Sequence, residues 1–435
     1  MRPLVTTSAE RLVLLPRAWL VACVTLSAMP ALKLGDVQGL ELVQALCLCV
    51  AAPLFVYCGM RIPAGGLWRR YGKGYLVFLC LSAGVSILAL RLPFYPPLDI
   101  SVLKKPLFLS LSRIFELCLA IYFMLAVAET LRRRPVLFRL ALGVYSWVGA
   151  LSACASIGGW ILLKTAGIST LLIYGPDGRV RGFFNEGGPY GMFLVSVVLV
   201  VLLRSHYFPP VYPFLSKAVL CLLLAALLLS GSKVGLLAAT GLCGIGVLCS
   251  GSGKQRFALI GACGVILAAL LTLFEGKLYG YAYAFLNFDE ALYYRPDDPS
   301  LIMGRLAASV IVPQMIAAHP WAGIGVGNYS LMRNDPDYLQ GLPAVDDWDL
   351  AGMGLLGSTA EFGVPLTLFL VALLLRPFIR AVRRKSPAIV AVAASFLPLA
   401  FLLGVNLNFF YPWLVAAFVL SLEPAPDGRT GTFQN

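Results

Sequence analysis

Histidine and charged residues are scarce in this chain of 435 residues. It contains two histidines, His206 and His319, and only 13% of its residues are charged, whereas 59% are hydrophobic. Two histidines leave almost no material for a histidine-based metal site or a Ser-His-Asp triad. So little charge beside so much apolar sequence excludes a soluble globular protein and favours a chain that crosses a lipid bilayer.

The eleven cysteines show no metal-ligand or redox spacing. Each lies in or at the edge of an apolar segment, where a free thiol behaves as a small hydrophobic side chain. A disulfide framework is therefore not expected. The turn 251–254 is not a phosphate-binding loop either, because Leu248 and Gln255 stand where that motif needs a glycine and a Ser or Thr.

Apolar runs long enough to cross a bilayer as helices make up most of the chain. We predict an all-α polytopic integral membrane protein with about twelve transmembrane helices. They are expected at residues 12–32, 38–59, 74–92, 107–129, 136–163, 188–203, 214–230, 234–250, 257–274, 353–375, 388–405 and 409–422. The first is expected to be an uncleaved span, because it is long and has no signal-peptide cleavage pattern.

The basic residues predict the orientation. With the N-terminus in the cytoplasm, 21 of the 34 lysines and arginines fall on the inner side, 12 on the outer side and Arg113 within a span. Residues 1–274 then form nine spans, 275–351 a large periplasmic loop with amphipathic helices, 352–422 three further spans, and 423–435 a cytoplasmic tail. The net charge of +13 follows from topology, and scattered basic residues do not indicate nucleic-acid binding.

Several cations on the predicted outer face run against the positive-inside rule. Arg179 and Arg181 precede the turn 182–190, and Lys233 lies in a tight turn between two apolar helices. Arg305 lies on a predicted amphipathic helix of the large loop. Cations gathered over a membrane-depth cavity suit a phosphate or pyrophosphate head group. Pairing of each cation with a neighbouring acid is the alternative.

The loop 275–351 also carries 10 of the 21 acids and many aromatic residues. Tyr329 and Trp348 are candidates for stacking on sugar rings, although aromatic side chains also anchor loops at the membrane interface. Asp349 is a candidate general base, with a helix N-cap as its alternative role. Glu186 is a second candidate carboxylate.

Two pairs of aspartates make a divalent-metal site a further alternative. Asp335 and Asp337, and Asp347 and Asp349, are each two residues apart, and carboxylate oxygens are the ligands that such ions prefer.

Five short motifs occur in an order that resembles the O-antigen ligase and Wzy-type polymerase superfamily of bacterial envelope enzymes. The resemblance covers roughly residues 180–420. The motifs are Gly-Phe-Phe-Asn at 182–185, Ser-Gly-Ser-Lys at 230–233, Gly304-Arg305, His319-Pro320 followed by Gly323-Ile324-Gly325, and Ala360-Glu361-Phe362-Gly363.

The resemblance implies transfer of a glycan from undecaprenyl pyrophosphate to a hydroxyl at the periplasmic face, with no metal or other cofactor. The family's basic residues fall on Lys233 and Arg305, which with Arg181 would hold the pyrophosphate. The implied location is the bacterial inner membrane, with both termini in the cytoplasm. The implied partners are the lipid-linked oligosaccharide donor and acceptor and membrane lipids, with a chain-length regulator protein as a further candidate.

Ligases of this superfamily carry a His-Asn nine residues before the glutamate of the Ala-Glu-x-Gly motif. Counting back from Glu361 leads to Gly352, so that histidine is absent. Its absence, together with Glu186 in the 182–190 turn, favours a polymerase of oligosaccharide repeat units. A ligase acting on a lipid A-core acceptor and a transporter or flippase of lipid-linked oligosaccharides are the alternatives, although the chain lacks the internal repeat of many transporters.

Overall fold

The computed structural model describes residues 17–34, 37–57, 66–98, 101–174, 178–209, 213–296, 298–346, 354–404 and 407–423. These residues are mostly helical. Two antiparallel two-stranded ribbons interrupt the helices: β1 (Lys33–Leu34) with β2 (Val37–Gln38), and β3 (Ile173–Tyr174) with β4 (Arg179–Val180). The predicted all-α class is confirmed.

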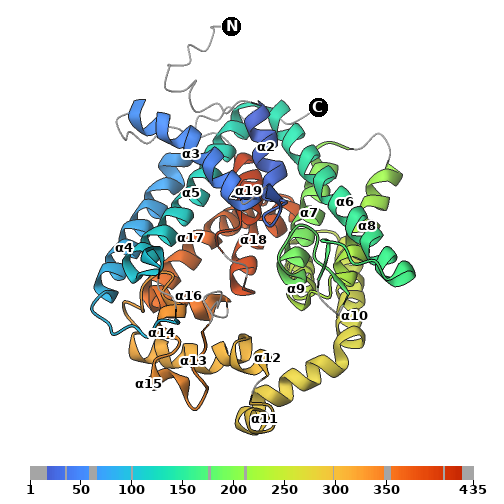
Figure 1. The fold of residues 1–435 in the computed structure, drawn as a ribbon. Coiled ribbons are helices and arrows are strands. Elements are labelled where there is room, and N and C mark those ends of the chain that lie inside the picture. Colours follow the sequence, from blue (N-terminus) through green and yellow to red (C-terminus); the bar gives the residue numbers. More distant parts are fainter. Residues whose placement is uncertain are drawn as a thin grey trace.

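A bundle of helices runs through the length of the molecule (Figure 1). Its helices are α2 (Arg17–Ser27), α3 (Gly39–Tyr57), the π-helical turn η1 (Trp68–Gly72) continuing as α4 (Lys73–Ala89), η2 (Val102–Lys104), α5 (Pro106–Arg133), α6 (Pro135–Ala166), α7 (Gly187–Tyr207), α8 (Pro213–Leu229), α9 (Lys233–Cys249), α10 (Gly253–Leu286), α16 (Gly354–Phe362), α17 (Val364–Arg383), α18 (Ala388–Leu402) and α19 (Phe410–Ser421). Within the described ranges, five segments are long and apolar enough to cross a membrane, namely 68–89, α5, α6, α7 and α17, and several shorter apolar helices accompany them. A count of twelve spans stays a prediction.

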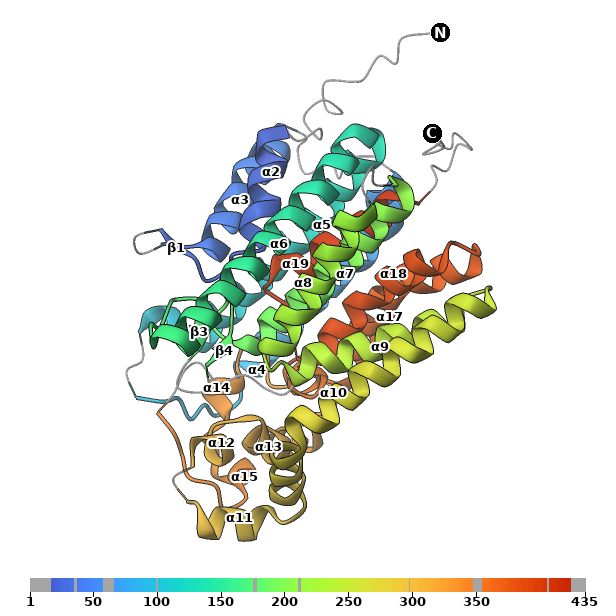
Figure 2. The same ribbon diagram turned by 90° about the vertical axis from the view of Figure 1, so that its right-hand side faces the viewer.

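Short helices gather at one end of the bundle, in an assembly that we call the cover. It consists of α11 (Phe288–Tyr294), α12 (Pro299–Ile302), α13 (Arg305–Ala318), α14 (Tyr329–Met332) and α15 (Pro336–Leu339), which lie together in both views (Figures 1 and 2). Buried Ile311, Met315 and Met332 form part of its own small core. Helix α10 enters the cover from the bundle, so the predicted boundary at residue 274 falls inside one continuous helix.

The opposite end of the bundle is held together by Glu423. Its carboxylate accepts hydrogen bonds from Arg70 and from the Tyr71 hydroxyl, and it lies 3.7 Å from Nη1 of Arg380. These residues come from η1, from α17 and from the segment after α19. Three parts of the chain that are far apart in sequence therefore meet at Glu423. They lie on the side that the charge distribution predicts to be cytoplasmic.

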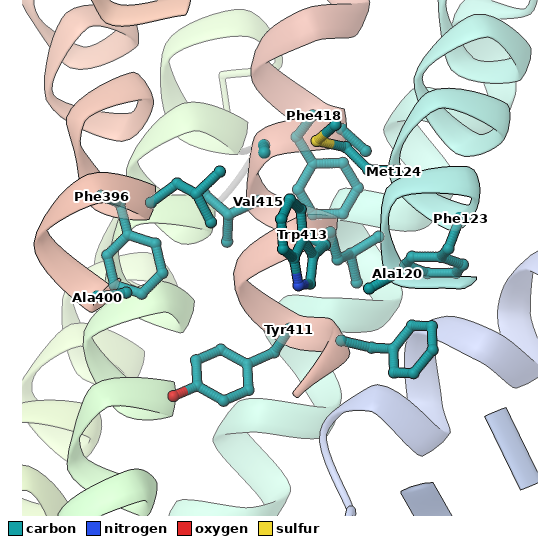
Figure 3. Packing of buried hydrophobic residues seen from close by; sticks show 14 of the residues in the cluster. Ala120, Phe123, Met124, Phe396, Ala400, Tyr411, Trp413, Val415 and Phe418 are labelled. Atoms are coloured by element: carbon teal, nitrogen blue, oxygen red, sulfur yellow. The ribbon is translucent and has the colours of Figure 1, made fainter. Parts of the chain in front are cut away.

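Helix α19 forms the centre of the bundle. All of its residues are buried, as expected for a helix that is apolar on every side. Trp413 lies between Phe396 of α18 and the α5 residues Ala120 and Phe123, with Tyr411 two residues before it in the same helix (Figure 3). This packing confirms the predicted helix at 409–422 and gives the bundle a rigid axis.

The helix expected over 353–375 is broken at Gly363. This residue has a φ of 77°, in the left-handed region that favours glycine. A β-carbon on it would lie 2.5 Å from the Trp321 carbonyl oxygen, and the N–H of Val364 donates to the carbonyl of Pro320 at 2.8 Å. The chain that leaves the cover thus packs into the break, which the apolar pattern alone does not reveal.

Candidate functional site

Arg305 is the first residue of α13. The short helix α12 precedes it as a separate helix. The Arg305 side chain is exposed, and its Nη2 atom lies 4.0 Å from the position that a β-carbon would take on Gly188. Since Gly188 is the second residue of α7, the start of a cover helix contacts the start of a bundle helix.

Ser232 connects the start of α9 to the same glycine. Its hydroxyl donates to the carbonyl of Gly188 at 3.0 Å and accepts from the N–H of Gly235 at 2.9 Å, which makes it the N-cap of α9. Lys233 follows as the first residue of that helix. The N-termini of α7, α9 and α13 therefore meet at Gly188, and we call them, with Lys233 and Arg305, the cationic cluster.

Glycines allow this close approach of α7 to the turn before α9. A β-carbon on Gly187 would lie 2.5 Å from the carbonyl oxygen of Ser230, and one on Gly191 would lie 2.2 Å from Cβ of Ser232. Contacts this short leave no room for any side chain. The start of α7 and the turn before α9 are consequently packed backbone against backbone.

Both cations occupy positions where they oppose the helix dipole. A helix N-terminus carries a partial positive charge of about +0.5, which favours acids rather than bases. Arg305 and Lys233 stand at the first positions of two helices that converge on the N-terminus of a third. The helix dipole does not account for this placement, whereas helix N-termini and basic side chains are both groups that commonly bind phosphate.

Glu186 lies beside the cationic cluster as the N-cap residue of α7. Its backbone is extended, its side chain makes no capping hydrogen bond, and it is exposed. Glu186 therefore presents its carboxylate to solvent next to Gly187.

The other two predicted basic residues support the chain that leads into α7. The Nε of Arg181 donates to the carbonyl of Leu171 at 3.0 Å, and its Nη1 donates to that of Asn185 at 3.2 Å. The guanidinium carbon of Arg179 lies 5.6 Å from the centre of the Tyr174 ring. Arg181 thus holds the turn 182–186 in place, which is a scaffold role for a residue predicted to bind substrate.

Tyr329 does not belong to the site. Its side chain is 4% exposed and packs in the core of the cover, and burial raises the pKa of its phenol to about 12. The predicted substrate contact of Tyr329 is therefore replaced by a structural role. Trp348 and Asp349, the other candidates from this part of the loop, lie outside the described residues.

The glycine-rich run 323–327 anchors the cover to the bundle. Its three glycines have φ values of 64°, 88° and 78°. The N–H of Val326 donates to the hydroxyl of Ser86 in α4 at 3.1 Å, and its carbonyl accepts from Ser110 in α5 at 2.8 Å. The carboxylate of Glu361 in α16 accepts from the N–H groups of Gly327 and Tyr329. The loop is structural, and Glu361 serves to hold it.

Arg333 holds the end of α12, which leads to Arg305 of the cationic cluster. Arg333 was not identified from the sequence. It is 1% exposed, and its guanidinium donates to the carbonyls of Ile302 and Pro343 and to the side chain of Asn334. Ile302 ends α12, three residues before Arg305. Arg333 therefore fixes the link from which α13 starts, and nothing in its sequence context distinguishes it from a solvated arginine.

His319 lies at the other end of α13 from Arg305. It is the C-cap residue of that helix, and its Nε2 lies 3.0 Å from the Tyr338 hydroxyl. Burial lowers the pKa of the imidazole, against the opposing effect of Asp335. A helix of 14 residues separates its ends by roughly 20 Å, so His319 is not within reach of a group bound at the cationic cluster.

The described part of the chain contains no group of three or more His, Cys, Asp and Glu side chains placed to hold a metal ion. Asp335 accepts the N–H of Asp337 at 3.0 Å and caps α15. This pair thus has a helix-capping role, while Asp347 and Asp349 lie outside the described residues.

The apolar helices indicate a multi-pass integral membrane protein, and its bundle and cover meet at the cationic cluster. Residues 218–371 match the sequence model of the family described as O-antigen ligase. This segment runs from α8 into α17 and includes Lys233 and Arg305, and the match supports the predicted resemblance to the O-antigen ligase and Wzy-type superfamily. Members of this family are glycosyltransferase-like enzymes. A comparison with curated proteins found no match.

Proposed function

We propose that the protein polymerises oligosaccharide repeat units carried on undecaprenyl pyrophosphate, at the periplasmic face of the bacterial inner membrane. The observation that carries this proposal is the meeting of three helix N-termini at Gly188 with Arg305 and Lys233 at two of them. A dianionic leaving group is the chemistry that such a cluster stabilises. The family match supports glycosyl transfer as the reaction.

In the proposed reaction a sugar hydroxyl of the acceptor attacks the anomeric carbon of the donor glycan. A new carbon–oxygen bond forms, and the bond from the anomeric carbon to the pyrophosphate oxygen breaks with its electron pair on the pyrophosphate. Negative charge thus grows on the leaving group in the transition state. Arg305 and Lys233, together with the N–H groups at the helix ends, stabilise that charge more than they stabilise the ground state.

The proton of the attacking hydroxyl passes to a carboxylate. Glu186, exposed beside Gly187, and Asp349 are the two proposed acceptors. The sugar pyrophosphate is an activated donor, so loss of the base should cost less than loss of a cation. In this proposal the residues need no metal ion, and polymerisation is expected to continue in the presence of a chelator.

Polymerase activity is favoured over ligase activity by the position of histidine. The residue nine before Glu361 is Gly352, and His319 lies roughly 20 Å from Arg305 along α13. Neither position 352 nor position 319 therefore places an imidazole beside the cationic cluster. Transfer to a lipid A-core acceptor stays as the second candidate, because the matched family model is described as O-antigen ligase. The comparisons give no support for a chain-length regulator protein as a partner.

Deletion of the gene tests the proposal. A polymerase deletion should leave single repeat units on the lipid carrier and abolish polymer. If long polymer accumulated on the lipid carrier without reaching lipid A-core, the protein would be a ligase. Failure of lipid-linked units to reach the periplasm would identify a flippase. Wild-type polymer of unchanged length and amount would contradict all three readings.

A further inference from the structure

A groove on the side of the bundle lies far from the cationic cluster. It is formed by α6 and the end of α7, has a volume of about 490 Å³, and is lined among others by Arg139, Gly143 and Trp147 of α6 and by Arg204 of α7. None of its lining residues is acidic. Arg204 stands 16 residues beyond Gly188 on α7, which separates the groove from the cluster by roughly 24 Å.

Two arginines line this groove, and one of them lies over a glycine. A β-carbon on Gly143 would lie 4.0 Å from the guanidinium carbon of Arg204, so Arg204 extends across the face of α6. Arg139 lies one turn before Gly143, and its guanidinium carbon is 5.7 Å from the centre of the Phe208 ring. This contact orients the planar group. Two guanidinium groups are thereby held at one end of the groove.

The rest of the groove is apolar and faces outward from the bundle. Val136 is 78% exposed and Trp147 is 50% exposed, and with Leu140 they share one face of α6 at helical spacing. Trp147 lies eight residues beyond Arg139, about 12 Å along the helix. On a membrane-spanning helix, an exposed apolar face contacts lipid chains, whereas arginines near the helix end lie at the level of the head groups.

We propose that this groove binds an anionic glycerophospholipid, with its phosphate held by Arg139 and Arg204 and an acyl chain lying along Leu140 and Trp147. The planar fork of arginine pairs with two phosphate oxygens. A volume of about 490 Å³ accommodates a head group and the first part of a chain. The lipid comes from the leaflet at the Glu423 end of the bundle, opposite the cover.

Binding of defined lipids to the purified full-length protein tests this proposal. Native mass spectrometry in mild detergent is used with phosphatidylglycerol, with phosphatidylcholine and with soluble glycerol 3-phosphate. The double variant Arg139→Gln/Arg204→Gln is expected to weaken phosphatidylglycerol binding by about tenfold or more. The control Arg383→Gln/Arg384→Gln removes two exposed arginines at the end of α17 and is expected to leave binding unchanged.

A second variant blocks the groove without changing charge. Gly143→Leu fills the space beside Arg204 and is also expected to weaken phosphatidylglycerol binding, which keeps the test valid if the double variant fails to fold. Unchanged affinity in both variants would overturn the proposal. Equal binding of phosphatidylcholine would show that the groove does not select an anionic lipid, and displacement of the lipid by an equal concentration of glycerol 3-phosphate would show a soluble-phosphate site. Either result would also overturn it.

Discussion

Nη2 of Arg305 lies 4.0 Å from the position that a β-carbon would take on Gly188. This contact joins the cover to the bundle at the point where three helices begin. The bundle supplies Lys233, Ser232 and the start of α7, and the cover supplies Arg305. Any movement of the cover therefore changes the distance between the two cations, and catalysis should depend on residues that hold the cover in place.

Substitutions of Gly188 test whether Arg305 must stay where it is. Gly188→Leu is expected to displace the guanidinium and to lower polymer formation by about a hundredfold, because misplacement by an ångström can cost that much. Gly188→Ala places only an ordinary van der Waals contact there and should retain most activity. Polymer is measured by gel electrophoresis in a complemented deletion strain. Equal activity of the two variants would show that polymer formation does not depend on the contact between Arg305 and Gly188.

The glycines between α7 and α9 should be required for stability. A β-carbon on Gly235 would lie 2.9 Å from the carbonyl carbon of Gly191, whereas one on Gly244 in the same helix meets open space. Gly235→Ala is expected to destabilise the protein by about 1–3 kcal/mol through overpacking. Gly244→Ala should be neutral or slightly stabilising. Thermal unfolding in detergent compares them, and equal midpoints would contradict the packing described here.

Loss of Arg333 should loosen the start of α13. Arg333→Met leaves the carbonyl of Ile302 without its buried donor, at an expected cost of about 1–3 kcal/mol. Amide hydrogen exchange of residues 298–318 should accelerate. Arg295→Met is the matched control, because Arg295 is exposed and pairs with Asp298 in a surface contact of 3.1 Å, which is worth little. Similar exchange in both variants would refute a positioning role for Arg333.

Stability of the cover should fall in acid because of His319. Burial lowers the pKa of this imidazole in the folded protein, so the unfolded chain binds more protons once the pH drops below the ordinary value of about 6.5. The stability that neutral His319 contributes is complete above that pH and is lost as the pH falls through the lowered pKa. His319→Gln should therefore lose less thermal stability than the wild type between pH 7.5 and pH 5. Parallel losses would exclude His319 as the cause.

Much of this architecture could be predicted from apolar pattern and charge. The helices of the bundle, the buried α19 and the meeting of Arg305, Lys233 and the turn before α7 all follow from motifs in the chain. The break at Gly363 could not be predicted, because it depends on a carbonyl of Trp321 that reaches the helix only after folding. The continuation of α10 into the cover could not be predicted, because the sequence of this helix changes from apolar to polar along its length.

The roles of single residues inside the cover were the hardest to predict. Tyr329 is of a residue type that stacks on sugar rings, yet its position after the glycine-rich run places it in the small core of the cover. Arg333 looks like one of many loop arginines, yet it is among the most deeply buried side chains. Both outcomes depend on tertiary packing between segments with no periodic pattern of their own.

The rate of polymer formation by the purified protein, with a repeat unit on a polyprenyl pyrophosphate as substrate, tests the central claim most directly. Arg305→Ala is compared with Arg295→Ala, which removes a charge from the same cover outside the cationic cluster. Loss of one preorganised donor to a developing negative charge typically costs about a hundredfold or more, so we expect that fall for Arg305→Ala and a nearly unchanged rate for Arg295→Ala. A full rate with Arg305→Ala would contradict the assignment of the cationic cluster to the departing pyrophosphate.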